Sequence, residues 1–169
     1  MIVAGQSRLT RPNHRLYAYQ SQHHTYDFVG GGNEVVCGYC HPEAETVVWS
    51  GDKCRVILAD EPGFDGWCRV IWSDHVRELS DLAGPDRDHF MAVVAAVERT
   101  LIALLEPVKM NIAALGTAAP HLHFHVIPRF ETDANFPAPV WTERRHTTSR
   151  LDRIALAERL RSAFADAVI

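Results

Sequence analysis

Residues 120–129, which read PHLHFHVIPR, place histidines at alternate positions, His121, His123 and His125. Apolar residues fill the gaps between them. A period of two is how a β-strand distributes side chains between its faces, so this pattern predicts a strand with three imidazoles on one face and apolar side chains in the core. Pro128 has no backbone N–H, and we expect it to end the strand or to lie on an edge.

Three interpretations of these histidines compete. Structural histidines on a half-exposed strand would suit a lone imidazole but explain three in register poorly. A metal site is the second interpretation, although H-x-H sites usually need a further carboxylate or histidine. The third is nucleophilic and acid–base catalysis at phosphorus, because imidazole can act as nucleophile, acid or base near neutral pH.

The residues before the histidines favour the third interpretation. Asn111, a short apolar run and Gly116 precede the H-φ-H-φ-H pattern, and this order resembles the histidine triad (HIT) family of nucleotide hydrolases and transferases. Residues 54–82 resemble the hairpin and first-helix entry of that family. Residues 133–141, DANFPAPVW, resemble a bacterial subgroup, the diadenosine-polyphosphate-hydrolase-like HIT proteins. The resemblance implies an α+β fold with an antiparallel β-sheet of about five strands, one long covering helix and a C-terminal helix.

Local patterns place these elements along the chain. Residues 82–106 carry an apolar stripe with steps of three or four, which predicts a helix that Pro107 stops. Ser149 resembles the start of a final helix that reaches about Ala167. Short apolar runs predict strands before and after the long helix, at residues 46–50, 54–58, 68–72 and 109–115.

Length and composition indicate a globular protein. The 169 residues suit a single domain, here residues 34–169, preceded by a polar extension at 1–33. The formal net charge of −4 argues against binding of a nucleic-acid polymer. No apolar run approaches the roughly 18 residues that a membrane span needs. The first residues lack a signal-peptide pattern, so we expect a cytoplasmic protein with reduced cysteines.

Cys37 and Cys40 form a C-x-x-C pair with three interpretations: a redox pair, incidental thiols or half of a zinc site. A redox pair would suit a thioredoxin-like start, which the chain lacks. In HIT proteins that carry this pair, the remaining ligands are a histidine after the hairpin and the first triad histidine. The resemblance therefore implies a structural zinc bound by Cys37, Cys40, His75 and His121, with His41 as a substitute ligand.

The resemblance also implies substrate contacts. Asp60 would accept hydrogen bonds from ribose hydroxyls, although a turn-forming role competes. Asn111 would contact the nucleotide phosphate, although a strand asparagine is more often structural. Gly116 would let the backbone approach the phosphate closely. The family usually has Gln and Ser or Thr next, and this chain has Thr117 and Ala118.

The mechanism that the resemblance implies uses no catalytic metal or organic cofactor. His123 would attack the α-phosphate of a nucleotide, His125 would bind the phosphate oxygens, and His121 would maintain the geometry. Superfamily transferases and phosphorylases usually carry Gln at the third triad position, so His125 favours a hydrolase.

We therefore expect a homodimeric hydrolase of dinucleoside polyphosphate-like conjugates that forms a nucleotidyl-histidine intermediate. The alternatives are a nucleoside phosphoramidase, a nucleotidyl transferase, a non-catalytic nucleotide-binding protein, and a metal-dependent enzyme with H-x-H ligands.

Overall fold

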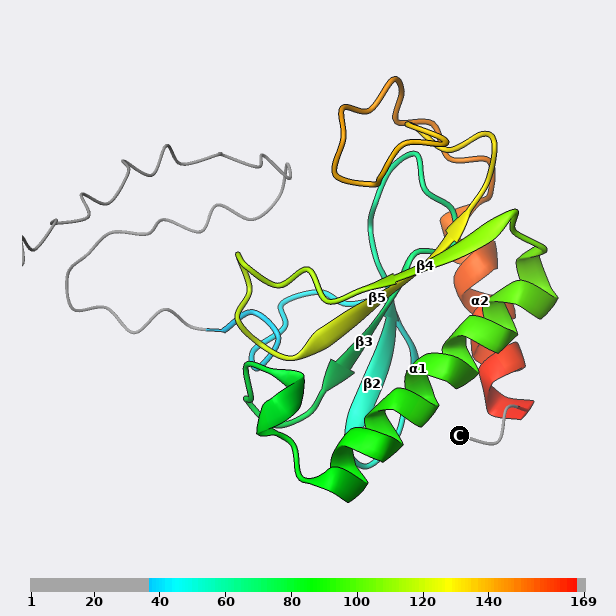
Figure 1. Ribbon diagram of the computed structural model, residues 1–169. Helices are drawn as coiled ribbons and strands as arrows, with labels where there is room; N and C mark the ends of the chain where they lie inside the picture. The colour runs from blue at the N-terminus through cyan, green and yellow to red at the C-terminus, as the bar shows by residue number, and fades with distance from the viewer. Residues whose placement is uncertain (1–36, 167–169) are drawn as a thin grey trace, which may run out of the picture. The chain divides into compact units, whose positions relative to one another are not determined.

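The computed structural model describes residues 37–166, which include a five-stranded antiparallel sheet. The strand order is β1-β2-β3-β5-β4, so the strand that carries His123 and His125 lies between β3 and β4 (Figure 1). The expected α+β class is confirmed, while the expected extension at residues 1–33 lies outside the described residues. The elements are β1 Val47–Ser50, β2 Cys54–Leu58, β3 Cys68–Trp72, a 3₁₀ turn at Leu79–Asp81, α1 Gly84–Leu105, β4 Lys109–Ala113, β5 His123–Arg129 and α2 Arg153–Asp166.

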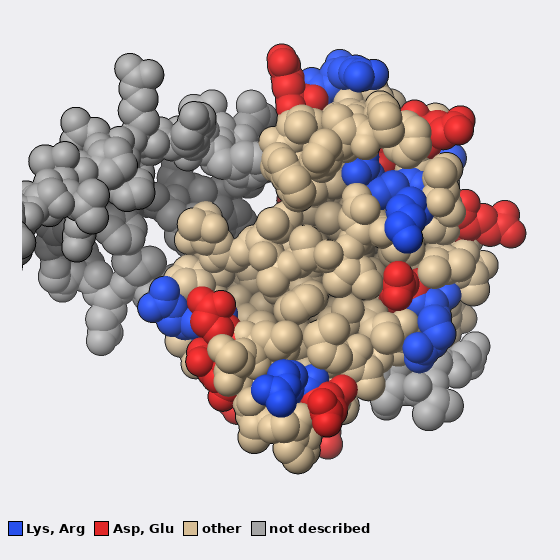
Figure 2. All heavy atoms as spheres, in the orientation of Figure 1, with Lys and Arg blue, Asp and Glu red and all other residues tan. Residues whose placement is uncertain are grey.

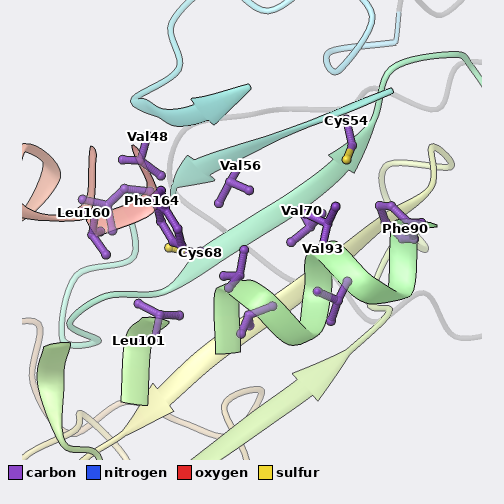
Figure 3. Packing of buried hydrophobic residues seen from close by; sticks show 14 of the residues in the cluster. Val48, Cys54, Val56, Cys68, Val70, Phe90, Val93, Leu101, Leu160 and Phe164 are labelled. Carbon is purple, nitrogen blue, oxygen red and sulfur yellow. The ribbon is translucent and has the colours of Figure 1, made fainter. Parts of the chain in front are cut away.

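Both helices cover the same face of the sheet. Phe90 and Leu101 of α1 and Leu160 and Phe164 of α2 are fully or almost fully buried, and they pack with the alternate residues of β2 and β3 that point to this side (Figure 3). In β3 these core residues are Cys68, Val70 and Trp72. Because strand side chains alternate, the intervening residues of the sheet project from the opposite face. That face carries His123 and His125.

The helix ends match their local sequence. Pro85 stands in the first turn of α1, and Glu106 ends the helix in the left-handed conformation with a φ of 49° just before Pro107. The start of α2 differs from the expectation, because Asp152 accepts a hydrogen bond from the Ala155 amide at 2.8 Å. Ser149 does not cap the helix; its hydroxyl accepts a hydrogen bond from the Gly63 amide.

Pro128 does not end its strand, which continues to Arg129. It lies opposite Met110 of β4, whereas pairing between β5 and β3 stops at Val126. On that side the strand is locally an edge, so the missing N–H of Pro128 removes no ladder bond. His121 differs too, because it lies in a bend before β5 and not within the strand.

The described residues include no helix long and apolar enough to cross a bilayer. Figure 2 shows that Lys and Arg side chains alternate with Asp and Glu side chains around an uncharged central area on the visible face. The described residues therefore form no large field of one sign on that face.

Candidate active site and metal group

His123 presents a lone pair on a defined nitrogen. The side chain is 3% exposed, and its Nδ1 lies 2.7 Å from the backbone carbonyl oxygen of His121. A carbonyl oxygen only accepts, so Nδ1 carries the hydrogen and donates it. The neutral ring therefore has its lone pair on Nε2. This is the tautomer that nucleophilic attack by Nε2 requires.

His125 is also held neutral, but a tryptophan fixes it in the opposite tautomer. The Trp67 indole Nε1–H donates to Nδ1 of His125 at 2.9 Å, and both residues are buried. Because indole is only a donor, Nδ1 must be the acceptor and Nε2 carries the hydrogen. Nε2 lies 3.3 Å from the Leu115 carbonyl oxygen. An imidazolium at His125 would turn a second N–H toward the indole N–H, so this contact disfavours the charged form.

Burial lowers the pKa of both strand histidines. Desolvation is the largest cause at His123 and His125, and the guanidinium of Arg69 is the next cause at His125. The pKa of His125 falls from 6.5 to about 3. Both imidazoles are therefore neutral near pH 7, with His123 an acceptor at Nε2 and His125 a donor at Nε2.

The loop between β4 and β5 approaches His123 closely at Gly116. A Cβ added to Gly116 would lie 3.1 Å from Cε1 of His123 and 3.1 Å from the Ala119 carbonyl oxygen. Thr117 and Ala118 are exposed at the turn that the hydrogen bond from the Ala119 amide to the Gly116 carbonyl closes. A side chain at this position would crowd the imidazole, so the glycine allows the loop to border the site closely.

Cys37, Cys40, His75 and His121 bring four ligand atoms within 4.8 Å of one another. Nδ1 of His121 lies 3.4 Å from Sγ of Cys37 and 3.5 Å from Sγ of Cys40, and Nδ1 of His75 lies 3.3 Å from Sγ of Cys40. Tetrahedral zinc with ordinary bond lengths separates sulfur and nitrogen ligands by ~3.5 Å. The four residues therefore fit a zinc ion, whereas the exposed His41 lies outside this group.

The metal group and the triad share His121. Nε2 of His121 donates to the Trp72 carbonyl oxygen at 2.7 Å, which leaves the Nδ1 lone pair directed at the two sulfur atoms. Such an outer hydrogen bond is typical of metal-binding histidines. Tyr39, between the two cysteines, places its ring 4.7 Å from the ring of His123. The C-x-x-C loop therefore contacts the triad face directly.

The structure does not bring Asp60 to the triad. Its side chain is 73% exposed and lies 3.7 Å from Nε of Arg153 in α2, where it lines a cavity of about 100 Å³ that no triad histidine borders. Asn111 lies in β4 on the triad side, opposite Ile127. Its Oδ1 accepts a hydrogen bond from Arg129 at 2.9 Å, and its Nδ2 contacts the Met110 carbonyl oxygen.

Sequence reasoning missed Trp67, Arg69 and Glu61. Trp67 and Arg69 flank the core residue Cys68, so the alternation around β3 assigns both to the other face. That signal was present in the sequence, but only the pairing of β3 with β5 shows that Arg69 lies opposite His125. Glu61, and not its neighbour Asp60, accepts a hydrogen bond from Arg69 at 2.7 Å.

Comparison with known proteins agrees with this architecture. Residues 42–132 match the family model of the HIT domain. A Mycobacterium tuberculosis H37Rv protein named AP-4-A phosphorylase is 32% identical over 100 residues, which cover 56% of this chain and 51% of the relative. The chain thus spans about half the length of the curated relatives that it matches.

Solved structures show the same fold. A histidine triad protein of Bradyrhizobium japonicum has a TM-score of 0.61 and 25% identity, over 73% of this chain and 90% of that one. A zinc-bound histidine triad family protein of Mycobacterium smegmatis has a TM-score of 0.54 and 25% identity, over 72% and 85% of the two chains. With the domain match spanning more than half of its residues, the chain belongs to the HIT family.

Proposed function

We propose that this protein is a hydrolase that cleaves nucleotidyl conjugates, such as dinucleoside polyphosphates, at the α-phosphate. The observation that carries the proposal is the tautomer of His123, whose Nδ1–H is committed to the His121 carbonyl and whose Nε2 lone pair is available. The neighbouring His125 offers an Nε2–H and cannot readily become charged. A nucleophile beside a neutral donor suits attack on an anionic phosphorus centre.

In the first step, Nε2 of His123 attacks the α-phosphorus and forms a P–N bond. The bond from phosphorus to the bridging oxygen breaks, and the leaving polyphosphate takes the electron pair. The Nε2–H of His125 donates to a non-bridging oxygen, where negative charge develops, and backbone N–H groups near Gly116 and Ala118 assist. A polyphosphate is a stable anion near pH 7, so it leaves without a proton.

In the second step, water attacks the phosphorus and the P–N bond breaks. The electron pair returns to Nε2 of His123, the water proton passes to solvent, and a nucleoside monophosphate is released. His121 acts indirectly, because its carbonyl oxygen accepts the Nδ1–H of His123. Thr117 remains a proposed contact for the leaving group, and Asn111 one for the phosphate through its Nδ2.

Asp60 is a further proposed contact, for the ribose. Its side chain is exposed, so ribose hydroxyls would compete with Arg153 for the carboxylate. Zinc is proposed at Cys37, Cys40, His75 and His121, where it would fix the C-x-x-C loop and His121 as a structural ion. None of the proposed bond-making steps passes through it.

A homodimer is also part of the proposal. β4 is an edge strand of the sheet, and it and its flanking residues expose three aliphatic side chains, Val108, Ile112 and Leu115. An exposed strand edge with apolar side chains can pair with a second copy of the same strand. Size-exclusion chromatography with light scattering tests this, and a monomer at micromolar concentration would contradict it.

A substrate panel tests the enzyme proposal. Diadenosine polyphosphates, an adenosine phosphoramidate and a nucleotide sugar are incubated with wild type, His123→Ala and the control His89→Ala on α1. We expect AMP release from one class, unchanged in the control and reduced roughly 10⁴-fold or more in His123→Ala. Quenched wild-type protein should carry a nucleotidyl adduct in its mass spectrum. A loss below about tenfold would remove His123 as the nucleophile.

Phosphorolysis is a second candidate, favoured by the similarity to the M. tuberculosis protein named AP-4-A phosphorylase. The acceptor in the second step would then be inorganic phosphate instead of water. Diadenosine tetraphosphate would yield ATP and ADP in phosphate buffer, but ATP and AMP if water is the acceptor. Chromatography of the products with and without phosphate separates the two reactions. Nucleotide binding with no product in either buffer would instead indicate a binding protein.

A further inference from the structure

Arg69 of β3 occupies an unusual place for a charged side chain. It lies directly opposite His125 on β5 and opposite Ile57 on β2, and it shares the triad face with His123. Its neighbours in sequence, Cys68 and Val70, are fully buried in the core on the other side. Strand pairing therefore fixes a guanidinium beside the two histidines.

Two other strand arginines on this face have their donors engaged. Arg129 donates to Asp133, Asn111, Asn135 and the Ala138 carbonyl, and only 4% of it is exposed. Arg55 donates twice to Glu45 and once to the Tyr39 carbonyl. Both therefore act as structural crosslinks.

Arg69 is bonded differently. Its Nη2 donates to Glu61 at 2.7 Å, but its Nε has no partner. Within residues 37–166, this Nε is the one buried side-chain nitrogen or oxygen atom that lacks a hydrogen bond. A buried donor without an acceptor destabilises the folded protein, so a purely structural reason for this arginine is weak.

Glu61 orients the guanidinium of Arg69. The same carboxylate accepts Nη2 of Arg144 at 2.7 Å, and the Arg144 guanidinium lies 5.1 Å from the centre of the Phe64 ring. One carboxylate is thus shared by two cations, and the three side chains carry a net positive charge. The Arg69 side chain remains 24% exposed, so part of it is accessible to a ligand.

We propose that Arg69 is a substrate-binding residue whose guanidinium donates hydrogen bonds to the non-bridging oxygens of the phosphoryl group at His123, with Glu61 as its positioning residue. The inference rests on the proposed function and adds a cation to a site whose β4–β5 loop supplies mainly backbone donors. A planar guanidinium matches two oxygens of a phosphate. The positive charge also contributes to the low pKa of His125, after burial.

Binding of AMP and of adenosine to the full-length protein separates a phosphate contact from a structural role. Calorimetric titrations compare wild type, Arg69→Met, Arg69→Lys and Arg161→Met, a control that removes one arginine from α2. We expect Arg69→Met to weaken AMP binding about tenfold or more, as for a lost charge-assisted hydrogen bond, and to leave adenosine binding within about twofold. Arg69→Lys should recover part of the AMP affinity, and Arg161→Met should change neither ligand.

Thermal unfolding of the same variants gives an independent readout. Arg69→Met should unfold at the same temperature as wild type or higher, because methionine removes the unpaired buried donor and fills a similar volume. Equal losses of AMP and adenosine affinity, together with a lower unfolding temperature, would indicate a structural arginine and overturn the proposal. If Arg69→Met does not fold, Arg69→Lys decides, since unchanged AMP binding after loss of the planar guanidinium would also overturn it.

The same titrations distinguish this proposal from the proposed hydrolase activity. Selective loss of AMP affinity in Arg69→Met, with no turnover by wild type on any substrate, supports the phosphate contact and refutes the enzyme. Turnover by wild type with unchanged AMP binding in Arg69→Met refutes the contact and leaves the enzyme standing. Failure of wild type to bind AMP refutes the contact.

Discussion

Acid should destabilise this protein through His125 in particular. The pKa of His125 is about 3 in the folded chain, because the ring is buried and the Arg69 guanidinium lies nearby, whereas its ordinary value is 6.5. Between these two values the unfolded chain binds more protons than the folded chain. Stability is therefore intact above about pH 6.5 and falls as the pH decreases toward 3.

The size of this effect follows from the two pKa values. Lowering the pH from 7.5 to 5 should remove about 2 kcal/mol of unfolding free energy through His125 alone, since unfolded His125 is then mostly charged and folded His125 is not. Other groups titrate over the same range, including His123, whose pKa is also lowered by burial. A matched variant is needed to isolate the one residue.

His125→Gln provides that comparison, because the glutamine amide oxygen can still accept the Trp67 N–H and never becomes charged. Urea unfolding of wild type and His125→Gln at pH 7.5 and pH 5 gives four free energies. We expect wild type to lose about 2 kcal/mol more than the variant. Equal losses in the two proteins would refute the assignment of a neutral, indole-bonded His125.

Two further predictions concern the loop and the metal group. Gly116→Ala should lower turnover while the protein stays folded, because the added Cβ would lie 3.1 Å from Cε1 of His123 and displace either the loop or the ring. Steady-state kinetics measures the turnover and circular dichroism checks the fold. Wild-type kinetics in the variant would contradict the prediction. Thiol titration should count no rapidly reactive cysteine in zinc-loaded protein, two after chelation frees Cys37 and Cys40, and four in denaturant. Cys54 and Cys68 react only after unfolding, because burial raises their pKa values to about 11 and about 12. Two reactive thiols before chelation would argue against metal at Cys37 and Cys40.

Much of the fold follows from local sequence. Alternation in CRVIL and CRVIW, the apolar stripe before Pro107 and the H-φ-H-φ-H pattern correctly predicted strands and a covering helix, because burial on one face imposes a period of two or 3.6. The C-x-x-C spacing likewise identified two of the four residues that lie together as candidate metal ligands, and the resemblance supplied His75 and His121. The roles of the catalytic residues stay predictions.

Tertiary structure alone decided which atoms of these residues can act. Trp67 precedes His125 by 58 residues, and only the pairing of β3 with β5 brings its indole to Nδ1 and so selects the tautomer. Which of the two neighbouring acids, Asp60 or Glu61, contacts Arg69 depends on the path of the chain after the end of β2, and periodicity does not specify this path. In the sequence Arg69 looks like an ordinary strand arginine, and only the register between β3 and β5 shows that it lies opposite His125. Periodicity is a local property that a sequence displays directly, whereas register and side-chain hydrogen bonds arise from contacts between distant segments, and these set the chemistry of the site.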